Sequence, residues 1–154
     1  MSADERFLAH QSQLPAASKP LGLYIPALVV DNMAYLSGHG PVMPDGKLVT
    51  GRVGDVITQE QAYQAARQTA LVMLASLRSA VGSLDRVDRL VKLLGMVYCT
   101  SDFLQQPAVI NGCSEVMKEV FGEAHGVGAR SAIGVAALPG GMSVEIEAIF
   151  RLKN

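Results

Sequence analysis

Two charged residues in the last quarter of the chain are the strongest candidates for chemistry. Arg130 follows a glycine-rich stretch, 126–128, and begins a β-like run of small residues. Its planar guanidinium suits bidentate capture of a carboxylate. Glu145 lies in the next β-like run, where it could orient or activate a water molecule, with a basicity set by Arg130 and by burial. The alternative is a structural ion pair of Arg130 with Glu145 or Glu147, and the residues alone leave both interpretations open.

Four further positions are candidates for lining a pocket. Ser37 and Gly38 could offer a hydroxyl and an open backbone, although a segment as rich in Gly and Pro as 36–41 is also typical of a simple turn. Tyr24 begins the first strand and is either a pocket wall or ordinary packing. Asn111 lies early in the second long helix, where its amide could contact a ligand or only the local backbone.

Other catalytic signatures are missing from the sequence. His10, His39 and His125 are isolated from one another, which argues against a metal site. No nucleophile elbow, Walker loop or dinucleotide fingerprint occurs. Cys99 and Cys113 fall in apolar runs and read as small core residues. We therefore expect no metal and no cofactor.

Composition excludes several classes of partner. The 154 residues are 49% apolar and 18% charged, and the net charge is -1 without runs of Lys or Arg. This pattern argues against a nucleic acid or an anionic membrane as partner. The amino terminus lacks a secretory signal and no apolar run is long enough to span a bilayer, so the expectation is a cytoplasmic protein.

Turn signals and alternation predict a sheet of mostly sequential strands. Asp31 and Asn32 suit a tight hairpin between the first two strands, and residues 138–141 separate the last two. The predicted strands are 23–30, 33–37, a short piece at 48–50, 87–100, 130–137 and 143–152.

Two long helices are predicted between these strands. Thr58 opens the first, with Gln61 in capping-box position, and Gly82 ends it. The second covers about 106–121 and stops at Gly122. Their buried stripes are rich in small and apolar residues, which indicates close packing onto a sheet.

The element order predicts an α+β two-layer sandwich, with a mixed β-sheet and two helices on one face. We assign residues 1–20 to an amino-terminal helix (5–13) with an extended arm (14–20), and residues 21–154 to a single domain.

Alternation along the last two strands predicts which side chains face the helices. Val144, Ile146, Ala148 and Phe150 share one face of the last strand, and Glu145, Glu147, Ile149 and Arg151 share the other. In the preceding strand, Ile133 and Val135 are expected to face the helices, and Arg130, Ala132, Gly134 and Ala136 to face away. The uncovered face is partly apolar, so we expect another subunit to cover it. Arg130, Glu145 and Glu147 would then point into that interface.

The run from Ala129 to Pro139, with Val144–Ile149 after it, resembles the carboxy-terminal signature of the RidA/YjgF family, which also carries the name L-PSP endoribonuclease. Residues 35–38 and 46–51 resemble its second-strand motif and the hairpin that follows. The resemblance covers about 21–151. It implies a chorismate mutase-like fold and a homotrimer with three clefts between subunits.

The resemblance also implies an activity and a site. Active members hydrolyse enamines and imines of the 2-aminoacrylate class to 2-oxo acids and ammonia. By this analogy, Arg130 holds the substrate carboxylate, Glu145 is linked to the hydrolytic water, and backbone groups around Ala132 hold the reacting end. Further cleft residues would be Tyr24, Ser37, Gly38 and Asn111.

Two other functions are weighed against the deaminase. One is a protein that binds a small carboxylate in the same cleft without chemistry, and the other, less favoured, is an RNA-cleaving enzyme. The chain departs from the family pattern at three places: Ala132 replaces a common cysteine, Gly134 an acidic residue, and His39 a glutamine.

Overall fold

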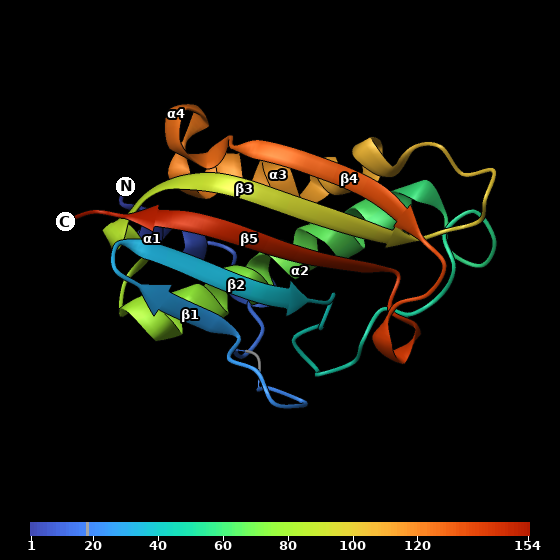
Figure 1. Ribbon diagram of the computed structural model, residues 1–154, viewed down its shortest axis with the longest axis horizontal. Helices are drawn as coiled ribbons and strands as arrows, with labels where there is room; N and C mark the ends of the chain where they lie inside the picture. The colour runs from blue at the N-terminus through green and yellow to red at the C-terminus, as the bar shows by residue number, and fades with distance from the viewer. Residues whose placement is uncertain (18) are drawn as a thin grey trace.

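A mixed five-stranded sheet organises the chain, for which the computed structural model describes residues 1–17 and 19–154. The strand order is β1-β2-β5-β3-β4 (Figure 1). The strands are β1 Ala27–Val30, β2 Met33–His39, β3 Val87–Tyr98, β4 Ala129–Val135 and β5 Val144–Leu152. Only β3 and β4 pair in parallel. The α+β sandwich is confirmed, but the sequential order is wrong, because the carboxy-terminal strand inserts between β2 and β3.

Two long helices, α2 Gln59–Val81 and α3 Gln106–Phe121, lie side by side behind the sheet (Figure 1). The predicted capping box starts α2: Thr58 and Gln61 exchange side-chain to backbone hydrogen bonds of 3.2 and 2.9 Å. Gly82 ends the helix with φ of 86°, a conformation that side chains with a Cβ disfavour. Both predicted helices are therefore confirmed nearly to the residue.

The hydrophobic core fills the space between these helices and one face of the sheet. The buried residues of β5 are Val144, Ile146, Ala148, Phe150 and Leu152, which confirms the predicted phase of that strand. The two helices approach closely at Gly112, where an added Cβ would overlap the backbone carbonyl of Tyr63. A single core thus fixes the helices and the sheet as one unit.

The amino terminus forms a shorter helix than predicted. α1 covers Ala3–Leu8, and a 3₁₀ turn at Gln11–Gln13 completes the segment. Asp4 fixes α1 to the body through Arg78 at 2.9 Å and the backbone N–H of Leu84 at 2.7 Å. The arm predicted over 14–20 includes Ser18, which lies outside the described residues.

The predicted phase of β4 is wrong. Its register pairs Arg130, Ala132 and Gly134 with Leu93, Gly95 and Val97 of β3, and these β3 positions face the helices. Ala132 accordingly packs against the core, while Ile133 faces away and is 44% exposed. The larger apolar side chains of β4, Ile133 and Val135, lie on the face away from the helices, so the size pattern indicated the wrong face, and the parallel register with β3 decides the orientation.

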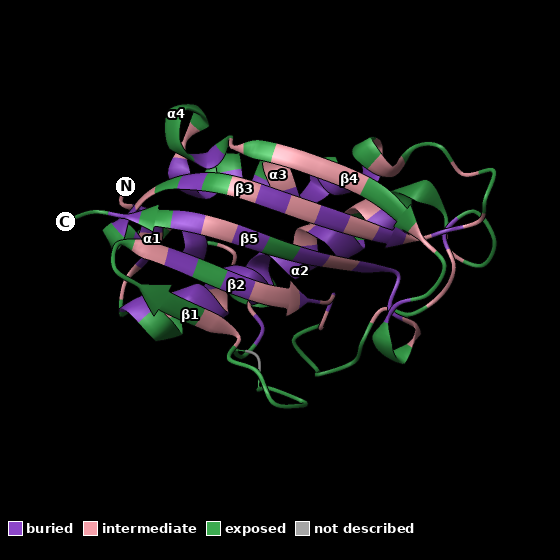
Figure 2. Cartoon of the chain, viewed as in Figure 1, coloured by how far each residue is buried: buried purple, intermediate pink, exposed green. Residues whose placement is uncertain are grey.

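The face of the sheet that points away from the helices stays open in one chain. Figure 2 shows buried and accessible positions alternating along β2, β3 and β5. Leu28, Tyr35 and Ile149 lie opposite one another on three neighbouring strands, and the first two are 45% and 43% exposed. Glu145 and Glu147 lie on the same face. An apolar row of this kind on a sheet is typical of an interface.

Candidate functional site

Arg130 lies on the helix side of the edge strand β4 and is held by α3. Its Nη1 donates to Asn111 Oδ1 at 2.8 Å and to Ser114 Oγ at 3.1 Å, and its Nη2 lies 3.5 Å from the carbonyl oxygen of Pro107. All three partners are neutral. Within the described chain no carboxylate lies in ion-pair distance of Arg130. The arginine is therefore oriented by hydrogen bonds while its charge stays available to an anion.

Glu145 lies on the opposite, open face of the sheet, beside β2. An added Cβ on Gly38 would overlap the Glu145 carboxylate, so the glycine creates the space that the acid occupies. The side chain is half-buried. Partial burial raises the pKa of the Glu145 carboxyl above its usual value, and the neighbouring charge of Glu147 adds to the rise.

A β-bulge in β2 shapes the cradle of Glu145. Leu36 pairs with Ala148 and His39 pairs with Ile146, so β2 contains one more residue than β5 over this stretch. Because of the bulge, His39 points to the helix side, where it is only 3% exposed. Strict alternation from Leu36 would have put its side chain on the open face.

Two of the predicted pocket residues share a hollow at this end of the open face. Tyr24 and Ser37 line a hollow of about 650 Å³ whose other lining residues are Gly22, Leu23, Ile25, Leu28, Tyr35 and Leu36. Ser37 is fixed there by hydrogen bonds from its Oγ to the carbonyl of Ile25, 2.7 Å, and from its N–H to the carbonyl of Pro26, 3.0 Å. Ser37 directly precedes Gly38 in β2, so the hollow and the space that holds the Glu145 carboxylate involve neighbouring residues of one strand.

The predicted residues thus form two groups. The first, called here the arginine group, comprises Arg130 and Asn111 together with Ser114. The second, the glutamate group, comprises Glu145, Gly38, Ser37 and Tyr24. The two groups lie on opposite faces of the sheet, so the proposed pairing of Arg130 with Glu145 or Glu147 inside one chain is wrong. Ala132 lies two residues after Arg130 on the same face of β4, and its methyl group packs against the core.

Sequence reasoning missed Ser114 and Ser76. Ser114 lies three residues after Asn111, a spacing that puts both on one face of a helix, and this signal could have identified it. Ser76 lies on α2 and contacts His39, 37 positions away, so no local pattern could have indicated it.

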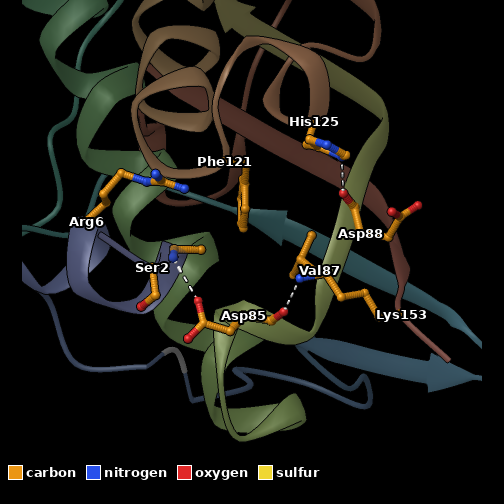
Figure 3. Close-up of a pocket in the computed structure, with 9 residues that line it drawn as sticks. Ser2, Arg6, Asp85, Val87, Asp88, Phe121, His125 and Lys153 are labelled. Carbon is orange, nitrogen blue, oxygen red and sulfur yellow. Dashed lines mark hydrogen bonds between the residues drawn. The ribbon is translucent and has the colours of Figure 1, made fainter.

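A separate hollow of about 380 Å³ lies between α1, the start of β3 and the helix α4 Glu123–Gly126 (Figure 3). Its polar groups largely bond one another. Asp85 accepts from the backbone N–H of Ala3 through Oδ1 and from Lys153 Nζ through its carbonyl, both at 2.7 Å, and His125 Nδ1 lies 2.7 Å from the carbonyl of Asp88. These bonds join both termini to the body of the fold. None of the predicted site residues lines this hollow.

Metal sites and membrane-spanning helices are absent from residues 1–17 and 19–154. No group of three His, Cys, Asp or Glu side chains is arranged to hold a metal ion. No described helix has the length and apolar character needed to cross a membrane. Cys99 and Cys113 are buried, and desolvation raises the pKa of the Cys113 thiol to about 12. Both cysteines are core residues, as predicted.

Comparison with known proteins identifies related chains along nearly the whole sequence. Residues 4–139 match a family model described as "YjgF/chorismate mutase-like, putative endoribonuclease". Protein TCP17 of Trypanosoma cruzi is 39% identical over 142 residues, which cover 92% of this chain and 89% of that protein. A 2-iminobutanoate/2-iminopropanoate deaminase of Dermatophagoides farinae is 35% identical over 136 residues, with 88% and 90% covered.

A solved structure is similar to this chain in both fold and sequence. The crystal structure of Atu1372, a protein of unknown function from Agrobacterium tumefaciens, superposes with a TM-score of 0.88 at 37% identity, covering 98% of this chain and 92% of that one.

Proposed function

Because the chain belongs to the YjgF/RidA family, we propose that it hydrolyses small imines and enamines of the 2-aminoacrylate class to 2-oxo acids and ammonia. The observation that carries the proposal is Arg130, a cation oriented by Asn111 and Ser114 without a carboxylate partner in the described chain. A 2-imino acid supplies the missing carboxylate. The deaminase of Dermatophagoides farinae, a relative along most of the chain, supports the same chemistry.

A second copy of the chain is part of the proposal. The arginine group and the glutamate group lie on opposite faces of one sheet, so one small molecule cannot contact both within a single chain. A neighbouring copy that covers the open face would bring its own arginine group to Glu145. Because the two contacting surfaces differ, the contact is head-to-tail, and such contacts close into rings. We propose a homotrimer with three equivalent clefts.

The proposed reaction requires an anchored carboxylate and a base. Arg130 binds the carboxylate of the substrate, and Glu145 removes a proton from a water molecule whose oxygen forms a bond to the imine carbon. The C=N π electrons move to nitrogen, which takes this proton from Glu145, and a neutral carbinolamine results. Glu145 then accepts the proton of the carbinolamine hydroxyl and delivers it to the nitrogen; the C–N bond breaks, the C=O bond of the 2-oxo acid forms, and ammonia leaves. A carboxyl whose pKa is raised toward neutrality suits this shuttling.

The test measures ammonia release from 2-iminopropanoate and 2-iminobutanoate generated in the assay by an amino-acid oxidase or dehydratase. Wild type should accelerate release, and Arg130→Ala should lose the acceleration. Arg130→Lys keeps the charge without the planar fork and should recover only part of it. Arg67→Ala is the matched control, because Arg67 pairs with Glu119 at 3.0 Å on the outer surface of the helices. An Arg130→Ala rate equal to that of wild type would refute the assignment.

The same protein samples decide between turnover and binding alone. Calorimetry with 2-oxobutanoate should show binding to wild type that is lost in Arg130→Ala. Binding without acceleration of any imine would favour a non-catalytic carboxylate-binding protein. Cleavage of RNA is disfavoured by the net charge of -1 and by the two acidic side chains, Glu145 and Glu147, on the open face.

A further inference from the structure

A buried imidazole supports the glutamate group from the other side of the sheet. His39 lies between β2 and α2, with Nδ1 2.6 Å from the carbonyl oxygen of Ser37 and Nε2 2.9 Å from Ser76 Oγ. A carbonyl oxygen can only accept, so Nδ1 carries the proton. Nε2 of the neutral ring then accepts from the Ser76 hydroxyl. The ring joins the backbone of β2 to the helix behind it.

The Ser37 carbonyl belongs to the bulge that makes room for Glu145. A bulge interrupts the regular ladder of backbone hydrogen bonds, and an interrupted strand needs another constraint to keep one conformation. Ser37 bonds to Ile25 and Pro26 through its hydroxyl and N–H, and the bond from His39 constrains its carbonyl. Gly38, between these two residues, is the position where any side chain would overlap the Glu145 carboxylate. The conformation of the bulge therefore decides how deeply that carboxylate lies against β2.

From these contacts we infer that His39 is a positioning residue, which locks the β2 bulge through Ser37 and Ser76 and thereby sets the place of the Glu145 carboxylate. This inference rests on the proposed function for its kinetic consequence only. His39 cannot contact a substrate in the cleft, because its side chain is 3% exposed and lies on the helix side of the sheet. Burial lowers the pKa of His39, which keeps the ring in the neutral form that this bonding pattern uses.

Loss of the imidazole should have a specific kinetic signature. Arg130 and its partners lie on the other face of the sheet and hold the substrate carboxylate independently of the bulge. His39→Ala should therefore lower kcat by about 10- to 100-fold, the effect of a misplaced catalytic group, while KM changes by less than about twofold. His39→Asn retains an N–H that can donate to the Ser37 carbonyl and should recover most of the loss. Ser76→Ala removes the contact of Nε2 with α2 but keeps the bond from Nδ1 to Ser37, so its kcat should lie between those of wild type and His39→Ala.

Thr69→Val provides the matched control for stability. Thr69 is buried on the same helix, and its hydroxyl donates to the carbonyl of Ala65 at 2.8 Å without contacting β2. Among the described residues its side-chain hydrogen bond is to its own helix, so replacement removes a buried bond that does not constrain the bulge; Tm should fall while kcat stays at the wild-type value. A Thr69→Val variant that loses kcat as His39→Ala does would assign the effect to general destabilisation and overturn the inference.

Two measurements test the inference without an assay of imine hydrolysis. Nitrogen NMR of protein labelled at histidine should show His39 with Nδ1 protonated and Nε2 bare, and the opposite tautomer would overturn the inference. Carbon NMR of the Glu145 carboxyl should show its pKa move toward the ordinary value in His39→Ala, because the carboxylate becomes more exposed to solvent. The groups facing Glu145 are Gly38 from β2, Met96 from β3 and Glu147 along β5.

These readouts test the positioning role of His39 separately from the proposed function. An unchanged Glu145 titration in folded His39→Ala or His39→Asn would refute the positioning role, whatever the kinetics. Absence of imine hydrolysis by wild type would refute the proposed function, while the tautomer and the titration would still decide the role of His39.

Discussion

At the scale of single residues, the chain separates the two charges that its proposed chemistry needs. Arg130 is held by neutral partners on α3, and Glu145 occupies space that Gly38 leaves free on the other side of the sheet. Arg130 is a cation without a carboxylate partner in the described chain, and Glu145 is a half-buried acid beside the like charge of Glu147, which with burial raises its pKa. A carboxyl perturbed in this way is characteristic of functional sites.

The acid makes stability depend on pH in a predictable direction. The pKa of Glu145 is raised above the usual 4.5 by burial and by Glu147, so the folded state binds this proton more tightly than the unfolded state. Below the usual pKa the group is neutral in both states. As pH rises through the interval up to the folded-state pKa, the folded protein loses stability. We expect Glu145→Gln to gain unfolding free energy relative to wild type between pH 4 and pH 7, and to lose imine hydrolysis by at least about 100-fold.

Chemical denaturation of both proteins at the two pH values measures this gain. The series is repeated in the Arg130→Ala background, because a guanidinium from a neighbouring copy would oppose the rise of the Glu145 pKa. Glu147→Gln is the control and should give a smaller gain, since it removes only the secondary cause. A Glu145→Gln difference that stays constant or shrinks between pH 4 and pH 7 in both backgrounds would contradict the burial argument.

Sequence patterns predicted the orientation of β5 better than that of β4. Large alternating side chains revealed the phase of β5, from Val144 to Phe150, because burial of the wrong set would have been costly. In β4 the contrast indicated the wrong face, because the small residues Ala132 and Gly134 lie toward the helices and the larger Ile133 lies away from them. The parallel register with β3 depends on the whole sheet, and it places Arg130 on the helix side.

At the scale of elements, the helices were the most predictable part, since caps and stripes are local signals. The capping box at Thr58 and the terminal glycines at 82 and 122 gave the ends of α2 and α3. The bulge in β2 was not predictable, because an inserted residue leaves no mark in a segment of Ser, Gly and His. The strand order was not predictable either. β5 returns to the centre of the sheet, and the order of elements along the chain does not reveal this.

The contact between α2 and α3 gives a test of helix packing. A Gly→Ala change within a helix ordinarily adds about 1 kcal/mol of stability. At Gly112 the new Cβ would overlap the backbone carbonyl of Tyr63, which cannot rotate aside as a side chain can. We expect Gly112→Ala to lower the unfolding free energy by about 1–3 kcal/mol, because overpacking outweighs propensity.

Urea denaturation measures this loss, with Ser79→Ala on the exposed side of α2 as control. The control should stay within about 0.5 kcal/mol of wild type. If Gly112→Ala proved more stable than wild type, the helices would not be in the close contact described. Because α3 also carries Asn111 and Ser114, the same variant should weaken the arginine group.

At the scale of the whole molecule, the separation of the two groups is the reason for proposing an assembly of several copies. The open face of the sheet bears Leu28 and Tyr35 beside the glutamate group, and the arginine group lies at the edge of the same sheet on its other side. The proposed head-to-tail ring would cover the apolar row and complete every cleft with one group from each of two neighbours. Each cleft of that ring would contain one Arg130 and one Glu145 from different chains.

Mixing two inactive variants tests this arrangement directly. Arg130→Ala and Glu145→Gln should each be inactive alone, because every cleft lacks one group. If they are unfolded together, refolded at equal amounts and allowed to associate at random, three quarters of the trimers contain both variants. In each mixed ring one cleft of three receives an intact Arg130 from one neighbour and an intact Glu145 from the other, so about a quarter of wild-type activity should return. Recovery requires that the two residues come from different chains, since a cleft built within one chain would stay inactive in every mixture. The control is a mixture of each variant with itself, treated identically, and its activity should remain at the level of the separate proteins.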